Sequence, residues 1–203
     1  VWISNRLGGD AEVLTKIPQG VNKHIWSPTE NKLLLVLTDP KPEELTLSKE
    51  DDKKAKPYVI DRRQFKQDYV GYLDRYRNHI YTFTPGDSMA TQFTFGDFDD
   101  SDPAWSPDGK KIAFVSNRTE DPDSNADTNI WVVSVDSKKT DTTLVQVTTN
   151  QNQDDSPTWS PNGKYIAYKT VLNGKLLWYA GEKLAISSSS GGQASILTEN
   201  LDR

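Results

Sequence analysis

The chain has 203 residues, enough to bury a sizeable core, and its lack of cysteine excludes disulfides and thiolate metal sites. Its net charge of −5 argues against nucleic acid and anionic membrane as partners, and no apolar run has the length of a transmembrane helix. This composition fits the cytoplasm or the periplasm and does not choose between them. Because the first residues are already typical of a strand, we expect a piece of a longer polypeptide.

Short stretches typical of β-strands, separated by turn residues, follow one another along the whole chain. Gly, Pro, Asn, Asp and Ser are spread evenly between them, as in folds built from many short strands. In chain order, strands are expected at residues 1–5, 11–15, 22–26, 32–38, 79–83, 92–94, 129–135, 144–148, 183–186 and 194–198.

A Trp-Ser-Pro hairpin recurs and organises the chain. Its tryptophans are Trp26, Trp105 and Trp159. In the second copy, Pro107 sets the first corner of a tight turn, and Gly109 can adopt the left-handed conformation that closes it. The first copy lacks this glycine, and Asn31 is the expected left-handed residue there. We expect the tryptophans to pack between neighbouring repeats; stacking on a ligand in a channel is the alternative.

Each hairpin is followed by two further strands, the last ending near Leu-Thr or Val-Thr. Four-stranded units that recur at roughly 40–50 residues are the sequence signature of a β-propeller. The predicted fold is therefore all-β: a partial β-propeller of about three and a half four-stranded antiparallel blades. A closed ring needs more blades, so we expect an open arc whose exposed blade faces self-associate.

The expected organisation is a single incomplete propeller domain over residues 1–203, in four parts. These are the outer half of a blade at 1–20, a blade at 21–98 with an insertion at 41–77, and blades at 99–150 and 151–203. Within the insertion, the charged stretch 43–56 predicts a solvated loop or a short helix, and 58–60 a short extra strand. We expect residues 68–73 to turn back at Gly71.

The block from Trp105 to Phe114, with Ile-Trp-Val-Val at 130–133 and the closing Leu-Thr, resembles the WD40-like repeats of two groups. One is the prolyl oligopeptidase family of serine peptidases, and the other is the TolB periplasmic propeller. Segments 61–81, 115–123 and 197–203 resemble the acylaminoacyl-peptidase-like members of the first group.

The peptidase resemblance implies an N-terminal propeller that caps a C-terminal α/β-hydrolase domain and admits only short peptides. Its implied partners are that hydrolase domain, absent from this chain, and oligopeptides. No Gly-x-Ser-x-Gly elbow is present, residues 187–192 are typical of a turn, and the two histidines, His24 and His79, fall in expected strands. We therefore expect a non-catalytic segment, with both histidines structural. A TolB-like module that acts through protein–protein contacts is the alternative.

Aromatic and cationic side chains gather in the insertion. Arg62, Tyr69, Tyr72 and Arg75 are the candidate substrate-binding residues, with Arg63 and Tyr76 beside them. Either part of this cluster faces the cavity and contacts peptide termini or carbonyls, or it packs the insertion against its blade through cation–π contacts and ion pairs. The acidic loop at 121–127 resembles a calcium loop but has Ala126 where the turn needs glycine, so neither metal nor cofactor is expected.

Overall fold

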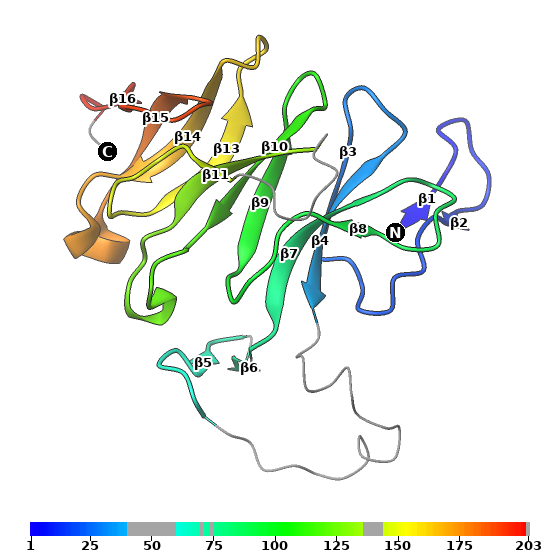
Figure 1. Ribbon diagram of the computed structural model, residues 1–203, viewed down its shortest axis with the longest axis horizontal. Helices are drawn as coiled ribbons and strands as arrows, with labels where there is room; N and C mark the ends of the chain where they lie inside the picture. Colours follow the sequence, from blue (N-terminus) through cyan, green and yellow to red (C-terminus); the bar gives the residue numbers. More distant parts are fainter. Residues whose placement is uncertain (40–59, 70, 74, 136–143, 202–203) are drawn as a thin grey trace.

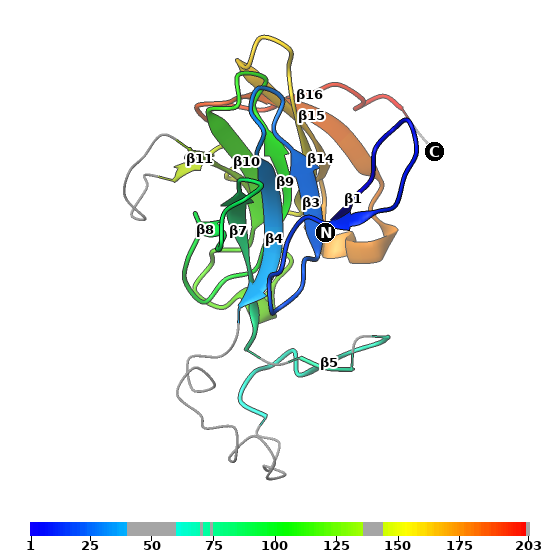
Figure 2. The same ribbon diagram turned by 90° about the vertical axis from the view of Figure 1, so that its right-hand side faces the viewer.

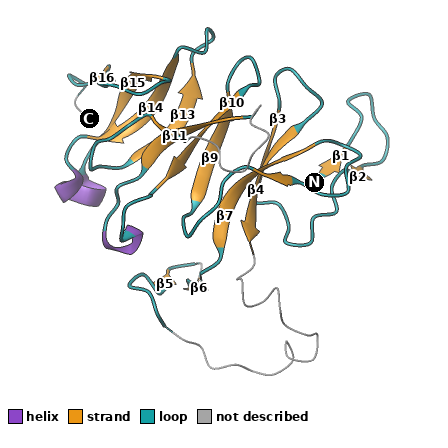
Figure 3. Cartoon of the chain, viewed as in Figure 1, coloured by secondary structure: helices purple, strands orange, loops and turns teal. Residues whose placement is uncertain are grey.

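The computed structural model describes residues 1–39, 60–69, 71–73, 75–135 and 144–201. The predicted loop or helix at 43–56 lies outside the described residues, as do the first two residues of the strand predicted at 58–60. Strands dominate (Figure 3). Helical structure in the described part consists of two 3₁₀ segments, η3 (Pro122–Ser124) and η4 (Gly174–Tyr179).

Three four-stranded antiparallel sheets lie side by side in a row (Figure 1). The first blade contains β3 (Lys23–Trp26), β4 (Leu33–Asp39), β7 (Arg77–Phe83) and β8 (Thr91–Gln92). The second contains β9 (Asp100–Trp105), β10 (Lys111–Ser116), β11 (Asn129–Ser134) and β12 (Val145–Gln146). The third contains β13 (Asp154–Trp159), β14 (Tyr165–Val171), β15 (Glu182–Ser188) and β16 (Ser195–Ile196).

A half-blade of two antiparallel strands, β1 (Trp2–Ile3) and β2 (Glu12–Val13), stands at the other end of the row from the third blade (Figure 1). No sheet closes on itself within the described ranges. The prediction of an all-β, partial propeller with about three and a half antiparallel blades is therefore confirmed.

The tryptophan hairpins of the second and third blades share one geometry. Gly109 and Gly163 take φ values of 69° and 68°, as the turn chemistry predicts. Each first strand also carries a bulge at a non-glycine residue in the left-handed region, Asp102 with φ 44° and Ser156 with φ 56°. The first blade pairs β3 with β4 without a bulge.

The prediction for Asn31 is wrong, because this residue does not take a positive φ. The first hairpin closes in another way. The Ser27 hydroxyl accepts bonds from the backbone N–H groups of Thr29 and Glu30 at 3.3 and 3.2 Å. In the second hairpin, Ser106 instead donates to the Asp108 carboxylate at 2.6 Å. A threonine in place of that aspartate leaves the serine hydroxyl to cap the turn backbone itself.

Apolar clusters between consecutive blades form the core. Trp159 packs with Val115, Ile130 and Val147 of the second blade, and its indole N–H donates to the Ala104 carbonyl at 3.1 Å. Trp105 packs against the first blade and its indole donates to Ile25 at 3.4 Å. The predicted packing role of these two tryptophans is confirmed.

The threonine that closes each unit joins the two outermost strands. Its hydroxyl accepts the backbone N–H of a residue in the third strand, with N–O distances of 2.8–2.9 Å. The pairs are Ile80 with Thr94, Ile130 with Thr148, and Leu184 with Thr198. This bond accounts for the Leu-Thr and Val-Thr endings, since threonine supplies an acceptor where the ladder stops.

The insertion contains a short hairpin of β5 (Lys66–Gln67) and β6 (Gly71–Tyr72), which lies beyond one end of the blades in both views (Figures 1 and 2). The chain reverses before Gly71, which is the first residue of β6, so the predicted corner at Gly71 is displaced. Among the described residues, no helix is both long and apolar enough to cross a bilayer.

Candidate functional site

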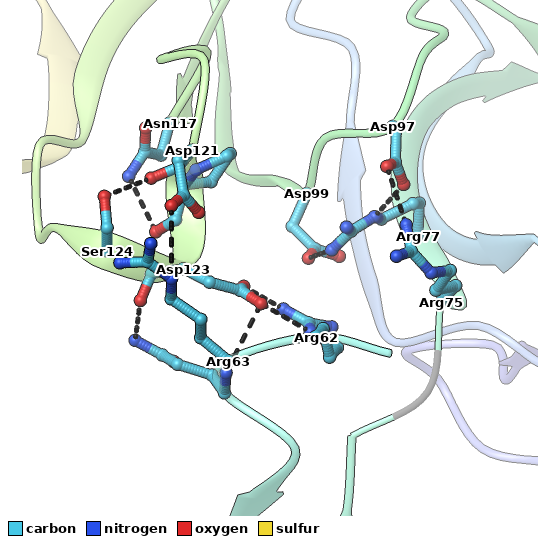
Figure 4. Close-up of polar contacts among 12 residues, drawn as sticks. Arg62, Arg63, Arg75, Arg77, Asp97, Asp99, Asn117, Asp121, Asp123 and Ser124 are labelled. Atoms are coloured by element: carbon cyan, nitrogen blue, oxygen red, sulfur yellow. Dashed lines mark hydrogen bonds and ion pairs between the residues drawn. The ribbon is translucent and has the colours of Figure 1, made fainter. Parts of the chain in front are cut away.

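A cavity of about 560 Å³ lies where the insertion meets the loop between β10 and β11. Its charged lining is balanced between five arginines and five acids. They are Arg62, Arg63, Arg75, Arg77 and Arg118, and Asp61, Asp97, Glu120, Asp121 and Asp123. Most of these side chains are drawn with their polar contacts in Figure 4.

Arg62 is the main connection between the insertion and the second blade. Its Nε and Nη2 both donate to the carboxylate of Asp123, a residue of η3, with the Nε–Oδ2 distance at 3.0 Å (Figure 4). Both side chains are largely buried. This hydrogen-bonded pairing lowers the pKa of Asp123, and two parallel bonds fix the relative orientation of the two segments.

Two neighbours reinforce this contact. The Gln64 side-chain amide donates to the Asp123 carbonyl at 3.3 Å, so the loop is held through its backbone as well. Arg63 approaches Asp121 at 3.5 Å, but 74% of its side chain is exposed. Arg63 therefore lies at the mouth of the cavity, and Arg62 lies in its wall.

A second ion-pair network anchors the return of the insertion into β7. Arg75 donates through Nε to Asp61 at 2.7 Å, closing the base of the insertion, and contacts Asp97 at 3.4 Å. Arg77 donates to Asp97 at 2.7 Å and to Asp99 at 2.9 Å (Figure 4). The hydrogen bond from Arg77 holds the pKa of Asp97 below its usual range.

Arg118 forms the buried floor of the cavity, and no sequence pattern indicated it. Its Nη2 donates to Asp100 at 2.8 Å, and its guanidinium lies 5.0 Å from the centre of the Phe98 ring. The rings of Phe114 and Trp131 are each 5.6 Å away. Burial raises the pKa of Asp100, against the opposing effect of Arg118, so this aspartate needs the cation beside it.

The four predicted site residues separate into two groups. Arg62 and Arg75 line the cavity and are engaged in ion pairs. Tyr69 and Tyr72 lie on the β5–β6 hairpin, away from the cavity lining, with exposed rings. Tyr69 is fully exposed and has φ 64°, so an aromatic side chain sits in a left-handed turn at the hairpin end.

The two histidines differ. His79 is buried, with Nδ1 2.7 Å from Asp39 and Nε2 3.1 Å from the Gly96 carbonyl, which confirms the structural role predicted for it. The same prediction for His24 is wrong, because that side chain lies exposed on β3 with no hydrogen bond to any described residue.

Oxygens of the acidic loop at 121–127 accept hydrogen bonds from the insertion and from within the loop. Asp123 binds Arg62, and the Asn125 amide donates to the Asp121 carbonyl at 2.9 Å. Over the part of the chain that the structure describes, no group of three or more acidic or histidine side chains is arranged to hold a metal ion.

The comparisons with known proteins agree with this architecture. No family model matches the chain. Over 134 residues the chain is 28% identical to YuxL, an uncharacterised peptidase of Bacillus subtilis, in an alignment that covers 66% of this chain and 20% of YuxL.

Two solved structures share the fold over 97% of this chain. One is a candidate TolB from Agrobacterium tumefaciens, with TM-score 0.59 and 20% identity over 55% of that protein. The other is TolB from Acinetobacter baumannii, with TM-score 0.57 and 18% identity over 37% of that protein. The chain thus spans about half or less of the length of these three proteins. The predicted resemblance to peptidase propellers and to the TolB propeller is confirmed.

Proposed function

We propose that this chain is the non-catalytic propeller part of a serine peptidase of the prolyl oligopeptidase type, and that it filters oligopeptides for a separate hydrolase domain. The observation that carries the proposal is the combination of a row of propeller blades with sequence relatedness to a peptidase. A propeller excludes folded proteins by size, whereas a flexible short peptide can reach a site behind it.

The charged cavity and its hairpin provide peptide contacts on the rim of this filter. Arg62 is largely buried and donates two hydrogen bonds to Asp123, so its role is to hold the insertion in place. Tyr69, Tyr72 and Arg75 have solvent-accessible side chains and are the groups that a peptide can reach. Aromatic rings and a guanidinium suit the apolar side chains and carbonyls of a short peptide.

The experiment uses the parent protein together with this 203-residue chain. The gene is sequenced beyond Arg203, and both proteins are assayed with chromogenic peptides. We expect a Gly-x-Ser-x-Gly elbow with a later aspartate and histidine, activity in the parent, and none in the 203-residue chain. A parent without this triad, or turnover by the 203-residue chain above background, contradicts the proposal.

A TolB-like binding module is the second candidate, favoured by the two TolB structures that cover nearly all of this chain. In this case the blades would act through protein–protein contacts, with no hydrolase attached. A parent gene that ends after a few more blades supports this candidate and excludes the first.

A further inference from the structure

A second cavity, of about 530 Å³, lies between the second and third blades. Its walls are the β10–β11 loop, the connection from β12 to β13, and the segment that leads from β14 into η4. Figure 3 shows the helical segments of these walls at one end of the blades. The residues that line the cavity fall between positions 125 and 175, in the middle of the row of blades and far from either end of the sequence.

Uncharged amide side chains dominate this lining, and we call the space the amide cavity. They belong to Asn125, Gln151, Asn152, Gln153 and Asn173. Lys175 is the one charged residue among the described residues of the lining, whereas the charged cavity is lined by ten. An amide presents a carbonyl acceptor and two N–H donors without net charge, so the amide cavity suits an uncharged polar ligand.

Hydrogen bonds within the protein fix the direction of the Asn152 amide. Its Oδ1 accepts the backbone N–H of Gly174 at 2.9 Å. A Cβ atom on residue 174 would lie 2.5 Å from this oxygen, so the contact requires glycine. The backbone N–H of Asn152 donates to Asn150 at 2.8 Å, and the Asn150 amide donates to the completely buried Asp154 at 2.7 Å. The NH2 group of Asn152, which bonds to no residue that the structure describes, is left for a ligand.

Asn173 is held in a similar way. Its Oδ1 accepts the backbone N–H of Lys175 at 3.2 Å, and its backbone carbonyl accepts the N–H of Leu176 at 3.0 Å. Because its side-chain oxygen is engaged, its NH2 group is the free end of the amide and has no partner in the described part of the chain. Asn173 directly precedes Gly174, the residue that Asn152 contacts, so the two asparagines stand side by side in the lining.

The fixed groups are donors, so a ligand must present acceptors to them. An extended peptide does so, since its carbonyl oxygens recur along each edge of the chain. Gln151 and Gln153 are exposed and their side chains make no hydrogen bond within the described ranges, so they can accept from peptide N–H groups. Leu172, which is 47% exposed, lines the same cavity and offers an apolar contact to a peptide side chain.

We propose that the amide cavity binds the main chain of an extended oligopeptide, with the NH2 groups of Asn152 and Asn173 donating to its carbonyl oxygens. Contacts to the main chain are the same for every sequence, so this site binds short peptides without selecting among them. The choice of a peptide over another uncharged polar ligand rests on the proposed function, whereas the donor pattern rests on the contacts described above.

The amide cavity adjoins the charged cavity. Asn125, in the wall of the first, donates to the Thr119 hydroxyl at 3.0 Å and to the Asp121 carbonyl at 2.9 Å, and both of these residues line the second. The β10–β11 loop thus separates a site for the main chain of a peptide from a site for charged groups.

Two-dimensional proton–nitrogen NMR spectra of the 203-residue chain report side-chain NH2 groups directly. The chain is titrated with tetra-alanine that is acetylated and amidated at its ends, and in a second sample with maltotetraose, an uncharged polar ligand without peptide groups. We expect saturable shifts of the Asn152 and Asn173 NH2 signals with the peptide and none with the sugar. Shifts with neither ligand, or shifts that the sugar produces at least as strongly as the peptide, overturn the proposal.

Asn152→Asp and Asn173→Asp test the two donors while keeping their structural bonds. Aspartate retains the oxygen that accepts from Gly174 or from Lys175 and lacks the NH2 group. Each variant should therefore bind the peptide on the order of tenfold more weakly. Backbone amide signals in the same spectra check that the variants fold. Peptide affinity that is unchanged in both variants overturns the proposal.

Asn162→Asp is the matched control for the added negative charge. Asn162 lies in the hairpin turn of the third blade, where it accepts from Ser160, and the second hairpin has Asp108 in the same role. This variant should bind the peptide like the unmodified chain. Equal weakening by all three substitutions would assign the effect to charge alone and overturn the proposal.

The outcome is separable from that of the proposed function. Peptide binding at Asn152 and Asn173, together with a longer protein that lacks the Ser-Asp-His triad, retains this site and rejects the peptidase. Peptide cleavage by the longer protein, without shifts of these two NH2 signals in the 203-residue chain, rejects this site and retains the filter.

Discussion

Arg62 and Asp123, 61 positions apart in the sequence, form a two-pronged ion pair that joins the insertion of the first blade to a loop of the second. The position of the β5–β6 hairpin therefore depends on a contact that lies outside its own blade. The insertion is therefore attached to the first blade by the chain and to the second blade by this ion pair.

Weakening this pair should loosen the hairpin. Lysine cannot form the two parallel bonds of arginine, so we expect Arg62→Lys to speed hydrogen exchange of the Leu73 amide, which donates to Phe65 at 2.8 Å, on the order of tenfold. Arg63→Lys is the matched control, since Arg63 is mostly exposed and should leave exchange unchanged. Equal effects of the two variants would show that Arg62 does not hold the hairpin.

Arg118 should be the most sensitive residue of the cavity. Arg118→Ala leaves the completely buried Asp100 without its cation, and the expected loss of unfolding free energy is about 3–5 kcal/mol. The double variant Asp100→Asn with Arg118→Met removes both charges and should recover most of that loss. Urea unfolding measures both; a loss below about 1 kcal/mol for Arg118→Ala would contradict the structural role.

Asp154 is a buried carboxyl group whose contribution to the free energy of unfolding should depend on pH. It is completely buried, its described neighbours include no cation, and burial raises its pKa above the ordinary value of 3.8. A raised pKa means that the carboxyl group favours folding below 3.8 and that this contribution is lost as the pH rises through the folded-state pKa.

We therefore expect Asp154→Asn to raise the Tm by roughly 2–4 °C at neutral pH, about 1 kcal/mol, with the gain shrinking as the pH falls toward 3.8. Thermal unfolding across this range provides the measurement, with Asp10→Asn on an exposed loop as control. A gain that does not change with pH would rule out the buried charge as its cause.

The tryptophans of the Trp-Ser-Pro hairpins should contribute unequally to the free energy of unfolding, although they share one motif. Trp159→Phe removes the indole bond to Ala104 and part of a buried ring, and should cost about 1–2 kcal/mol. Trp26→Phe should cost little, because Trp26 is 44% exposed and its indole has no acceptor among the described residues. Similar costs at the two sites would contradict the packing described for Trp159.

The features that could be predicted from the sequence are those set by residues a few positions apart, namely the tight turns and the strands. The turns at Gly109 and Gly163 follow from Pro and Gly at fixed positions, and the strand periodicity places each blade. The pairing of Arg62 with Asp123 was not predictable in this way, because several arginines and aspartates nearby offer the same chemistry. Asp102 and Ser156 were missed because their left-handed bulges are imposed by the pairing of whole strands, which no residue type signals.

The proposed filter is tested most directly in the longer protein that the proposal implies, by comparing kcat/KM for a short peptide with kcat/KM for a folded protein, with and without residues 1–203. The account predicts that the intact parent cleaves only the short peptide. Removing residues 1–203 should raise the relative rate on the folded protein on the order of tenfold or more. An unchanged ratio between the two substrates would contradict a filtering role for this chain.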